Sequence, residues 1–275
     1  MGVNRMIPGV SGTVENNRKI AFDTLGSLGY LNEKTSVLVC GADGTRLFGH
    51  ESDTPRRSAS LIKLFIADYY LTASGESLDA QMAVSKKDRI GNSIITELRI
   101  ERISLYDALA AMLACSDNTA TNLLIARCGF DALNAHIRGG IGADGTVIMR
   151  KMLDFAAAER GCDNMTTARD CFRCLSRLDA HPVGRSLLTM QKDRERLMRY
   201  ILADVGFAGK SGDIEGVYND AGMLDDITGK RVFAAVLTDG AERSMAKRLC
   251  GRVGLAAYGA SPDAAVCAVR GGKVS

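Results

Sequence analysis

The sequence predicts a mixed fold with two parts, an α/β domain built from both ends of the chain and an all-α domain inserted between them. Strand-like runs of apolar and β-branched residues cluster near residue 40 and again after residue 205. Helical periodicity and capping residues fill the stretch between them. We therefore expect an α/β domain from residues 1–55 and 200–275, a helical domain from 56–199, and a site in the cleft between the two.

The N-terminal elements follow from apolar spacing and from one turn signal. Residues 13–29 place apolar side chains at helical spacing, which predicts a helix. The runs 35–40 and 45–49 are typical of short strands, and Asp43-Gly44 between them is typical of a tight hairpin. We expect a helix followed by a β-hairpin.

The later elements follow from capping residues, helix breakers and a change of period. Ser104 is a typical N-cap, Thr167 with Asp170 resembles a capping box, and His181-Pro182 separates two helices. The helices predicted for the central block are 58–73, 105–114, 119–128, 167–180 and 183–198. Strands at 205–210, 216–224 and 231–238 and a closing helix at 242–258 complete the prediction.

Composition argues against several classes of protein. The 275 residues are 46% apolar and 24% charged with a formal net charge of +3, which is typical of a globular protein and argues against a nucleic-acid partner. No apolar run is long enough to cross a bilayer, so we expect no membrane partner. No charged and then apolar leader opens the sequence, which leaves two compartments open: the cytoplasm, or export with the leader removed.

Cysteine and histidine form no pattern that indicates a metal or a redox centre. Eight cysteines are too few for a disulfide scaffold of this length, and Cys171 and Cys174 are expected to share one helix face. The histidines, His50, His136 and His181, are scattered, and each is expected to be structural. We therefore expect no metal and no cofactor.

The first chemical signal is Ser60-Leu61-Ile62-Lys63 within the predicted helix 58–73. One helical turn brings Ser60 and Lys63 side by side. A serine hydroxyl needs an adjacent proton acceptor to attack an acyl carbon, and a lysine serves if burial or nearby cations lower its pKa. Near a helix start, the Ser60 amide is also free to bind a developing oxyanion.

This motif alone is a weak signal, because about one S-x-x-K is expected by chance in a chain of this length. Two further tripeptides make the signal specific. One lies in the short gap between two predicted helices, and the other ends a predicted strand. On a strand the lysine and glycine face one way and the serine the other, although a twisted edge lets the ammonium and hydroxyl meet one carboxylate. They are Ser116-Asp117-Asn118 and Lys210-Ser211-Gly212.

In this order, the three motifs resemble the signature set of class A β-lactamases and penicillin-binding proteins. Segments 58–63 and 216–222 also resemble the family's nucleophile helix and the strand after its third motif. The resemblance extends from about residue 15 to residue 260. It implies a β-lactamase/transpeptidase-like fold, with an antiparallel sheet flanked by helices and an inserted helical domain.

The resemblance also implies a role for each motif residue. Ser60 resembles the acylated nucleophile, Lys63 its proton acceptor, and Ser116 the hydroxyl that protonates the leaving nitrogen. Asn118 resembles the residue that orients Lys63 and hydrogen-bonds the substrate amide. The implied substrate-binding strand consists of Lys210, Ser211, Gly212 and Asp213, whose backbone amide would form the oxyanion hole with that of Ser60.

The sequence departs from the family pattern at two places. Class A enzymes carry a loop glutamate that activates the deacylating water, but alignment on Arg150 places Met152 at that position. Asp154 or Glu159 could replace the glutamate, or both could be solvated surface carboxylates. The second departure is Asp213, which with Glu215 would bring negative charge near an anionic substrate and, with Lys210 alone to offset it, reduce affinity.

We therefore expect a serine hydrolase that acts on β-lactams through an acyl-enzyme on Ser60, with slow deacylation. One alternative is a D-alanyl-D-alanine peptidase or esterase on the same scaffold. The other is a penicillin-binding module that acylates once and stays blocked. The sequence leaves the true substrate and the oligomeric state open.

Overall fold

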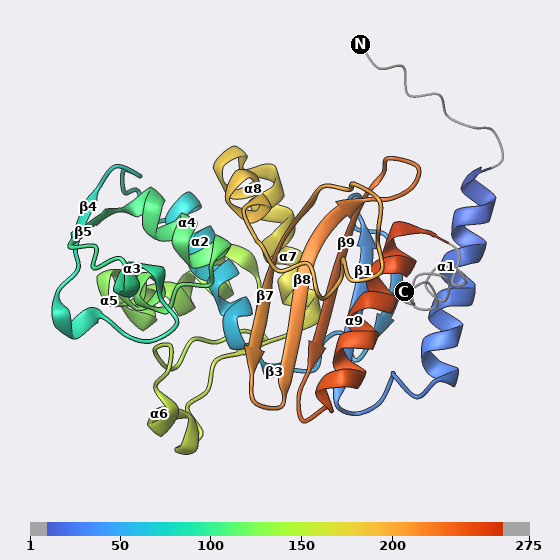
Figure 1. Ribbon diagram of the computed structural model, residues 1–275, viewed down its shortest axis with the longest axis horizontal. Coiled ribbons are helices and arrows are strands. Elements are labelled where there is room, and N and C mark those ends of the chain that lie inside the picture. Colours follow the sequence, from blue (N-terminus) through green and yellow to red (C-terminus); the bar gives the residue numbers. More distant parts are fainter. Residues whose placement is uncertain (1–9, 261–275) are drawn as a thin grey trace, which may run out of the picture.

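The molecule is built around an antiparallel sheet of five strands in the order β2-β1-β9-β8-β7 (Figure 1). The structure is a computed structural model and describes residues 10–260; Cys267 and the outer ends of the predicted α/β domain lie outside this range. All four strand pairings are antiparallel, as expected. The strands are β1 (Thr35–Gly41), β2 (Arg46–His50), β7 (Phe207–Ile214), β8 (Val217–Asp225) and β9 (Arg231–Thr238). Strands from the two ends of the chain therefore share one sheet.

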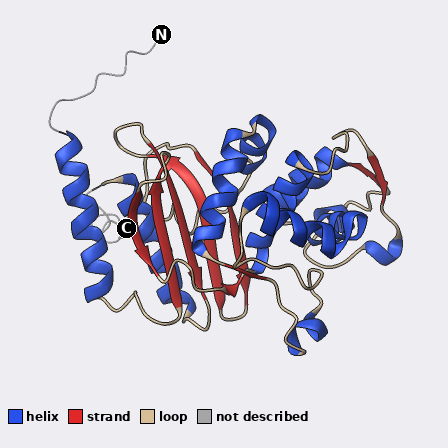
Figure 2. Ribbon diagram, turned by 180° about the vertical axis from the view of Figure 1, so that it is seen from behind, coloured by secondary structure: helices blue, strands red, loops and turns tan. Residues whose placement is uncertain are grey.

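Helices cover both faces of this sheet. The C-terminal helix α9 (Arg243–Tyr258) packs on β8 and β9, and α1 (Val10–Ser27) lies alongside it. On the other face, α7 (Ala168–Ala180) packs on β1, β8 and β9 (Figure 2). The Phe172 and Phe233 rings are in edge-to-face contact there. The sheet thus separates two apolar cores, one beneath α9 and one that continues into the helical part.

The helical part adjoins the β7 edge of the sheet (Figures 1 and 2). Its larger helices are α2 (Ile62–Thr72), α4 (Leu105–Ala114), α5 (Asn118–Ala135) and α8 (Pro182–Thr189). Shorter elements connect them: β3 (Arg56–Arg57), the 3₁₀ turns η1 (Ala59–Leu61) and η2 (Lys86–Asp88), β4 (Gln81–Ala83), α3 (Ile94–Glu97), β5 (Arg102–Ser104), the π-helix η3 (His136–Ile141), α6 (Phe155–Glu159) and β6 (Met165–Thr166). Within residues 10–260 no helix is both long and apolar enough to span a membrane.

Several local signals act as the sequence predicts. The Ser104 side chain accepts a hydrogen bond from the Asp107 amide, and Thr167 accepts one from Asp170, so each caps its helix. His181 caps α8 through the Gly184 amide. Asp43 accepts the Thr45 amide and helps close the turn between β1 and β2.

Three element predictions are wrong in detail. The predicted helix 58–73 is divided, because η1 precedes α2 and Ala59 has a left-handed backbone with φ of +46°. The predicted helix 183–198 ends at Thr189, and residues 190–206 form neither helix nor strand. Finally, α5 continues beyond the expected end at 128, with a kink at Gly129.

Candidate active site

Ser60 lies in the η1 turn, which packs directly on strand β7. The approach is so close that a Cβ atom added to Gly212 would lie 2.9 Å from the Ser60 amide nitrogen and 3.1 Å from that of Leu61. Only glycine permits this contact without displacement of backbone atoms. The Ser60 side chain is half-buried, and its turn is entered through the left-handed Ala59. Backbone strain of this kind is concentrated at functional sites.

Lys63 is fully buried one turn after Ser60 and forms the centre of a polar cluster. Its Nζ donates to the Ser116 carbonyl oxygen at 2.7 Å, to Ser116 Oγ at 3.0 Å and to Asn118 Oδ1 at 3.0 Å. Within the described residues, none of its hydrogen bonds goes to Ser60. Burial, reinforced by the charge of Lys210, lowers the pKa of Lys63 well below its ordinary value. The amine is thereby prepared to accept a proton.

The loop between α4 and α5 presents Ser116 and Asn118 to this amine. Ser116 has a left-handed backbone, with φ of +56°. The buried Asp117 fixes the loop, because its carboxylate accepts the Ala120 amide at 2.8 Å and the Ile95 amide at 3.1 Å. Asp117 therefore holds the motif in place and caps α5.

Lys210 lies on β7, the edge strand, and is almost fully buried. Its Nζ donates to the Ser211 carbonyl oxygen at 2.7 Å. Burial lowers the pKa of Lys210 to about 7, although the nearby Asp220 carboxylate opposes this shift. The Ser211 amide donates to Gln191 Oε1 at 2.7 Å, so this part of the strand edge faces the segment that follows α8.

The surroundings of Asp213 differ from the expectation that Lys210 alone offsets its charge. Its carboxylate is exposed but pairs with Arg196 Nη2 at 3.2 Å and with Arg243 Nη2 at 3.1 Å. Two arginines thus neutralise the negative charge at this end of β7. Sequence spacing does not predict either ion pair, because Arg196 precedes β7 in the sequence and Arg243 lies well after it, at the start of α9.

The loop that carries Met152 is tied to the helical part through backbone hydrogen bonds. The Asn122 side chain forms two hydrogen bonds with the Met152 backbone: its Oδ1 accepts from the amide at 2.7 Å, and its Nδ2 donates to the carbonyl oxygen at 3.2 Å. The Met152 side chain is buried in the apolar core. The loop has no carboxylate at this position.

Neither candidate replacement carboxylate is brought into the Lys63 cluster. Asp154 caps α6 by accepting the Ala157 amide at 3.0 Å, and both Asp154 and Glu159 are exposed. Helix α6 projects from the body of the molecule (Figure 1). Among the described residues, neither carboxylate hydrogen-bonds to Ser60, Lys63 or Asn118.

Sequence reasoning missed the residues that hold the cluster together from outside. Asn164 Oδ1 accepts the amides of Met149 and Arg150, its Nδ2 donates to the Arg150 carbonyl, and its own carbonyl accepts the Ser58 amide at 2.8 Å. Asn164 thus connects the Met152 loop to the segment that leads into Ser60. No motif or periodicity marks such a residue.

The remaining predicted non-catalytic residues have structural environments. Cys171 and Cys174 share the buried face of α7, and burial raises the pKa of Cys171 to about 12, so the thiol is unreactive. His136 contacts the buried Asp68 at 2.7 Å, and His50 contacts the Asn32 carbonyl at 3.1 Å. Residues 10–260 contain no cluster of side chains suited to a metal ion.

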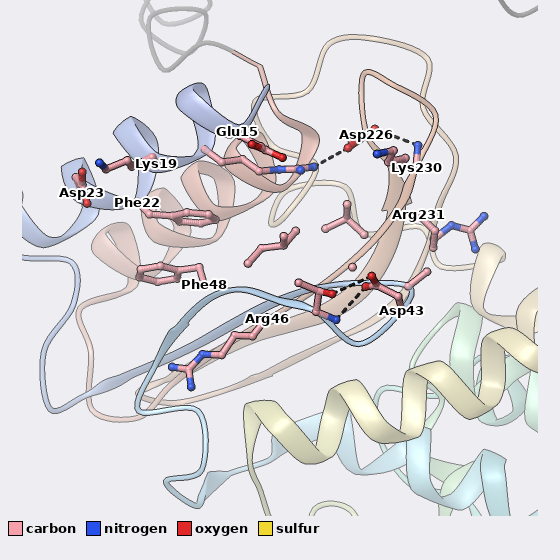
Figure 3. Close-up of a pocket in the computed structure, with 16 residues that line it drawn as sticks. Glu15, Lys19, Phe22, Asp23, Asp43, Arg46, Phe48, Asp226, Lys230 and Arg231 are labelled. Carbon is pink, nitrogen blue, oxygen red and sulfur yellow. Dashed lines mark hydrogen bonds and ion pairs between the residues drawn. The ribbon is translucent and has the colours of Figure 1, made fainter. Parts of the chain in front are cut away.

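A cavity of about 930 Å³ lies away from Ser60, between α1, β2 and the β8–β9 turn (Figure 3). Its walls carry charges of both signs and the stacked rings of Phe22 and Phe48. A cavity of about 450 Å³ lies at the β7–β8 hairpin beside Asp213. Of the predicted site residues, Asp213 lines this second cavity, whereas Ser60, Lys63 and Lys210 do not.

Known proteins share the fold of this chain. The family described as Beta-lactamase enzyme family matches residues 22–260. A beta-lactamase from Sphaerobacter thermophilus is 22% identical, with a TM-score of 0.69 over 90% of this chain and 95% of that one. A class A beta-lactamase from Mycobacterium abscessus is 21% identical, with a TM-score of 0.74 over 91% and 99% of the two chains.

A third similar structure is a PBP-A mutant in an acyl-enzyme complex with penicillin G. It is 21% identical, with a TM-score of 0.74 over 88% of this chain and 95% of that one. Similarity at such identities shows a shared fold. No curated protein matches the chain.

Proposed function

The chain belongs to the beta-lactamase enzyme family, and from this premise we propose that it is a serine hydrolase that opens β-lactams through an acyl-enzyme on Ser60. The observation that carries the proposal is the Lys63 cluster. A buried amine of lowered pKa, one turn from a serine, contacts a second hydroxyl and an amide oxygen. This arrangement suits proton transfer between two hydroxyl groups and has little use in a purely structural core.

In the proposed acylation, Ser60 Oγ attacks the lactam carbonyl carbon and Lys63 in its neutral form takes the hydroxyl proton. The carbon–nitrogen bond of the ring then breaks, and the Ser116 hydroxyl gives its proton to the leaving nitrogen. Ser116 regains a proton from Lys63, whose Nζ lies 3.0 Å from its Oγ. The proton balance closes, and the product is an ester on Ser60.

Substrate and oxyanion would be held by β7 and the η1 turn. We assign the oxyanion hole to the backbone amides of Ser60 and Asp213, which the Gly212 contact supports. Lys210 and Ser211 would bind the substrate carboxylate, and Asn118 the substrate amide. The residues beside them support this use, because Asp213 is neutralised by two arginines.

Deacylation is the step for which the site is poorly equipped. An apolar thioether at position 152 neither deprotonates water nor holds it well. Loss of general-base help costs about 10² to 10⁴ in rate. We therefore propose rapid acylation followed by slow hydrolysis of the ester. The same observation favours a second candidate, a D-alanyl-D-alanine peptidase or esterase, and in the extreme a module that stays acylated.

Turnover of a chromogenic cephalosporin, measured beside a D-alanyl-D-alanine peptide and ester, tests the proposal. The expected course is a burst near one equivalent followed by a slow steady state, which Ser60→Ala abolishes with a loss of about 10⁴ or more. Ser186→Ala, an exposed serine on α8, is the matched control. Faster turnover of the peptide or ester than of the cephalosporin would favour the peptidase instead. Undiminished activity of Ser60→Ala would contradict both.

A further inference from the structure

Arg196 is buried in the irregular segment between α8 and β7, where it binds the strand near its C-terminal end. Its Nη1 donates to the carbonyl oxygens of Gly212 and Asn219, each at 3.0 Å. Its Nε pairs with Asp193 at 2.6 Å and its Nη2 with Asp213 at 3.2 Å. The guanidinium carbon lies 3.7 Å from the centre of the Tyr218 ring. All three side-chain nitrogens of Arg196 therefore have partners, and its guanidinium also contacts an aromatic ring.

The Gly212 carbonyl belongs to the same peptide unit as the Asp213 amide, the proposed second oxyanion donor. A trans peptide is planar, and its C=O and N–H point in opposite directions. The Ser211 amide is bound on the outer edge of β7 by Gln191. Amides two residues apart on a strand point the same way, so the Asp213 amide also points outward. Whatever fixes the Gly212 oxygen therefore aims the Asp213 amide.

We infer that Arg196 is a positioning residue for the oxyanion hole, an inference that rests on the proposed function. It fixes the 212–213 peptide through its hydrogen bond to the Gly212 oxygen. Because a charged donor draws electron density toward that oxygen, it also makes the Asp213 amide a stronger donor. The ion pair between Arg196 and Asp213 also fixes the Asp213 side chain relative to this peptide.

Direct contact with substrate is a poorer use for this side chain. It is buried, and its three nitrogens are all engaged by protein acceptors in the described part of the chain. Arg243 provides a matched comparison, because it pairs with the same Asp213 carboxylate and has no hydrogen bond to the Gly212 oxygen. A comparison of variants at the two arginines therefore distinguishes the effect of the carbonyl contact from that of the ion pair.

The test uses the acyl-enzyme that the whole chain forms with a penicillin. Hydrogen bonds from the oxyanion hole lower the stretching frequency of the ester carbonyl, which infrared difference spectra measure directly. Arg196→Gln should raise that frequency and slow acylation about 10- to 100-fold, less than the loss of an entire donor. The dissociation constant before acylation should rise no more than it does in Arg243→Gln, because both variants remove one of the two cations beside Asp213. Arg196→Lys keeps the charge but loses the several donor nitrogens of the planar guanidinium, so its carbonyl frequency and acylation rate should be intermediate. Arg243→Gln should keep the wild-type carbonyl frequency, although it removes one of the two cations beside Asp213.

The possible outcomes distinguish a failure of the inference about Arg196 from a failure of the proposed function. Wild-type protein that forms no adduct would overturn the proposed function alone, whatever Arg196 does. An adduct with unchanged frequency and rate in both Arg196 variants would overturn the inference. So would weaker initial binding at an unchanged frequency, which would make Arg196 a substrate contact. Equal effects of Arg196→Gln and Arg243→Gln would assign the role to the ion pair instead. If Arg196→Gln does not fold, the Lys variant decides.

Discussion

At the scale of single residues, the site depends on two buried lysines in different roles. Burial and the nearby charge of Lys210 lower the pKa of Lys63 well below its ordinary value, which favours its neutral form. Lys210 has a lowered pKa as well, but the Asp220 carboxylate favours its charged form. In the proposed mechanism, this difference in environment makes Lys63 the proton acceptor and Lys210 the cationic binding group.

This separation predicts how initial binding of a penicillin depends on pH. Burial lowers the pKa of Lys210 to about 7, with Asp220 and Asp193 acting against Arg196. The charged form binds the substrate carboxylate, so the dissociation constant should rise as pH increases through about 7 and approach a tenfold rise per unit. Stopped-flow measurements between pH 6 and 8.5 check this. The same substrate as a methyl ester, and the Lys210→Ala variant, should show no such rise. A flat profile for the free acid would contradict the assignment.

The residues of the site divide by how much the sequence reveals. Ser60, Lys63 and Asn118 were predictable because local spacing and motif order place them, and the structure brings Lys63 and Asn118 into contact. Asn164 and Arg196 were not predictable, because each acts through backbone groups brought near only by the fold. Such contacts leave no periodic or motif signal in the chain.

Asn164 gives a prediction for stability at the same scale. Asn164→Ala removes the partners of two backbone amides and one carbonyl. An unsatisfied buried group costs about 1–3 kcal/mol, so the variant should lose about 3 kcal/mol in urea unfolding. Asn16→Ala, at an exposed position of α1, is the control. A loss below about 1 kcal/mol would show that the loop re-forms its hydrogen bonds without Asn164.

At the scale of elements, the irregular segment 190–206 shows why helix prediction failed there. Its residues are good helix formers, but their polar groups are used by the sheet. Gln191 binds the Ser211 amide, Arg196 binds the Gly212 carbonyl, and the Leu197 amide binds Asp220. Tertiary hydrogen bonds of this kind override helix propensity. The segment that was mispredicted is the one that supports the site strand.

Helix α6 is the element that decides whether an unusual base replaces the absent glutamate. Asp154 caps this helix, and Asn caps equally well, so Asp154→Asn removes the carboxylate while keeping the helix. We expect Asp154→Asn and Glu159→Gln to change the slow steady-state rate by less than about twofold. A decrease of 10² or more in either variant would identify that residue as the deacylation base. Met152→Glu, in contrast, should partly restore turnover.

At the scale of the whole molecule, strand distribution alone predicted how the chain closes on itself. Strands from residues 35–50 and 207–238 form one sheet, as their clustering at the two ends indicated. The domain boundaries stay a prediction, and α7, inside the predicted helical domain, packs on the sheet. The docking of α1 had no sequence signal. Phe22 and Leu25 pack into the core beneath α9, and Arg18 donates to Asp226 and to the Ala257 carbonyl.

The proposed function requires a covalent ester at Ser60 that forms quickly and hydrolyses slowly. Intact-protein mass spectrometry after mixing with penicillin G, followed over time and combined with peptide mapping, measures this most directly. We expect a gain of one whole penicillin on the peptide that carries Ser60, complete before the first turnover ends and lasting far longer than it took to form. The adduct should be absent from Ser60→Ala and present in Ser186→Ala. Protein that stays unmodified during rapid hydrolysis would contradict slow deacylation, and an adduct that persists in Ser60→Ala would contradict the nucleophile itself.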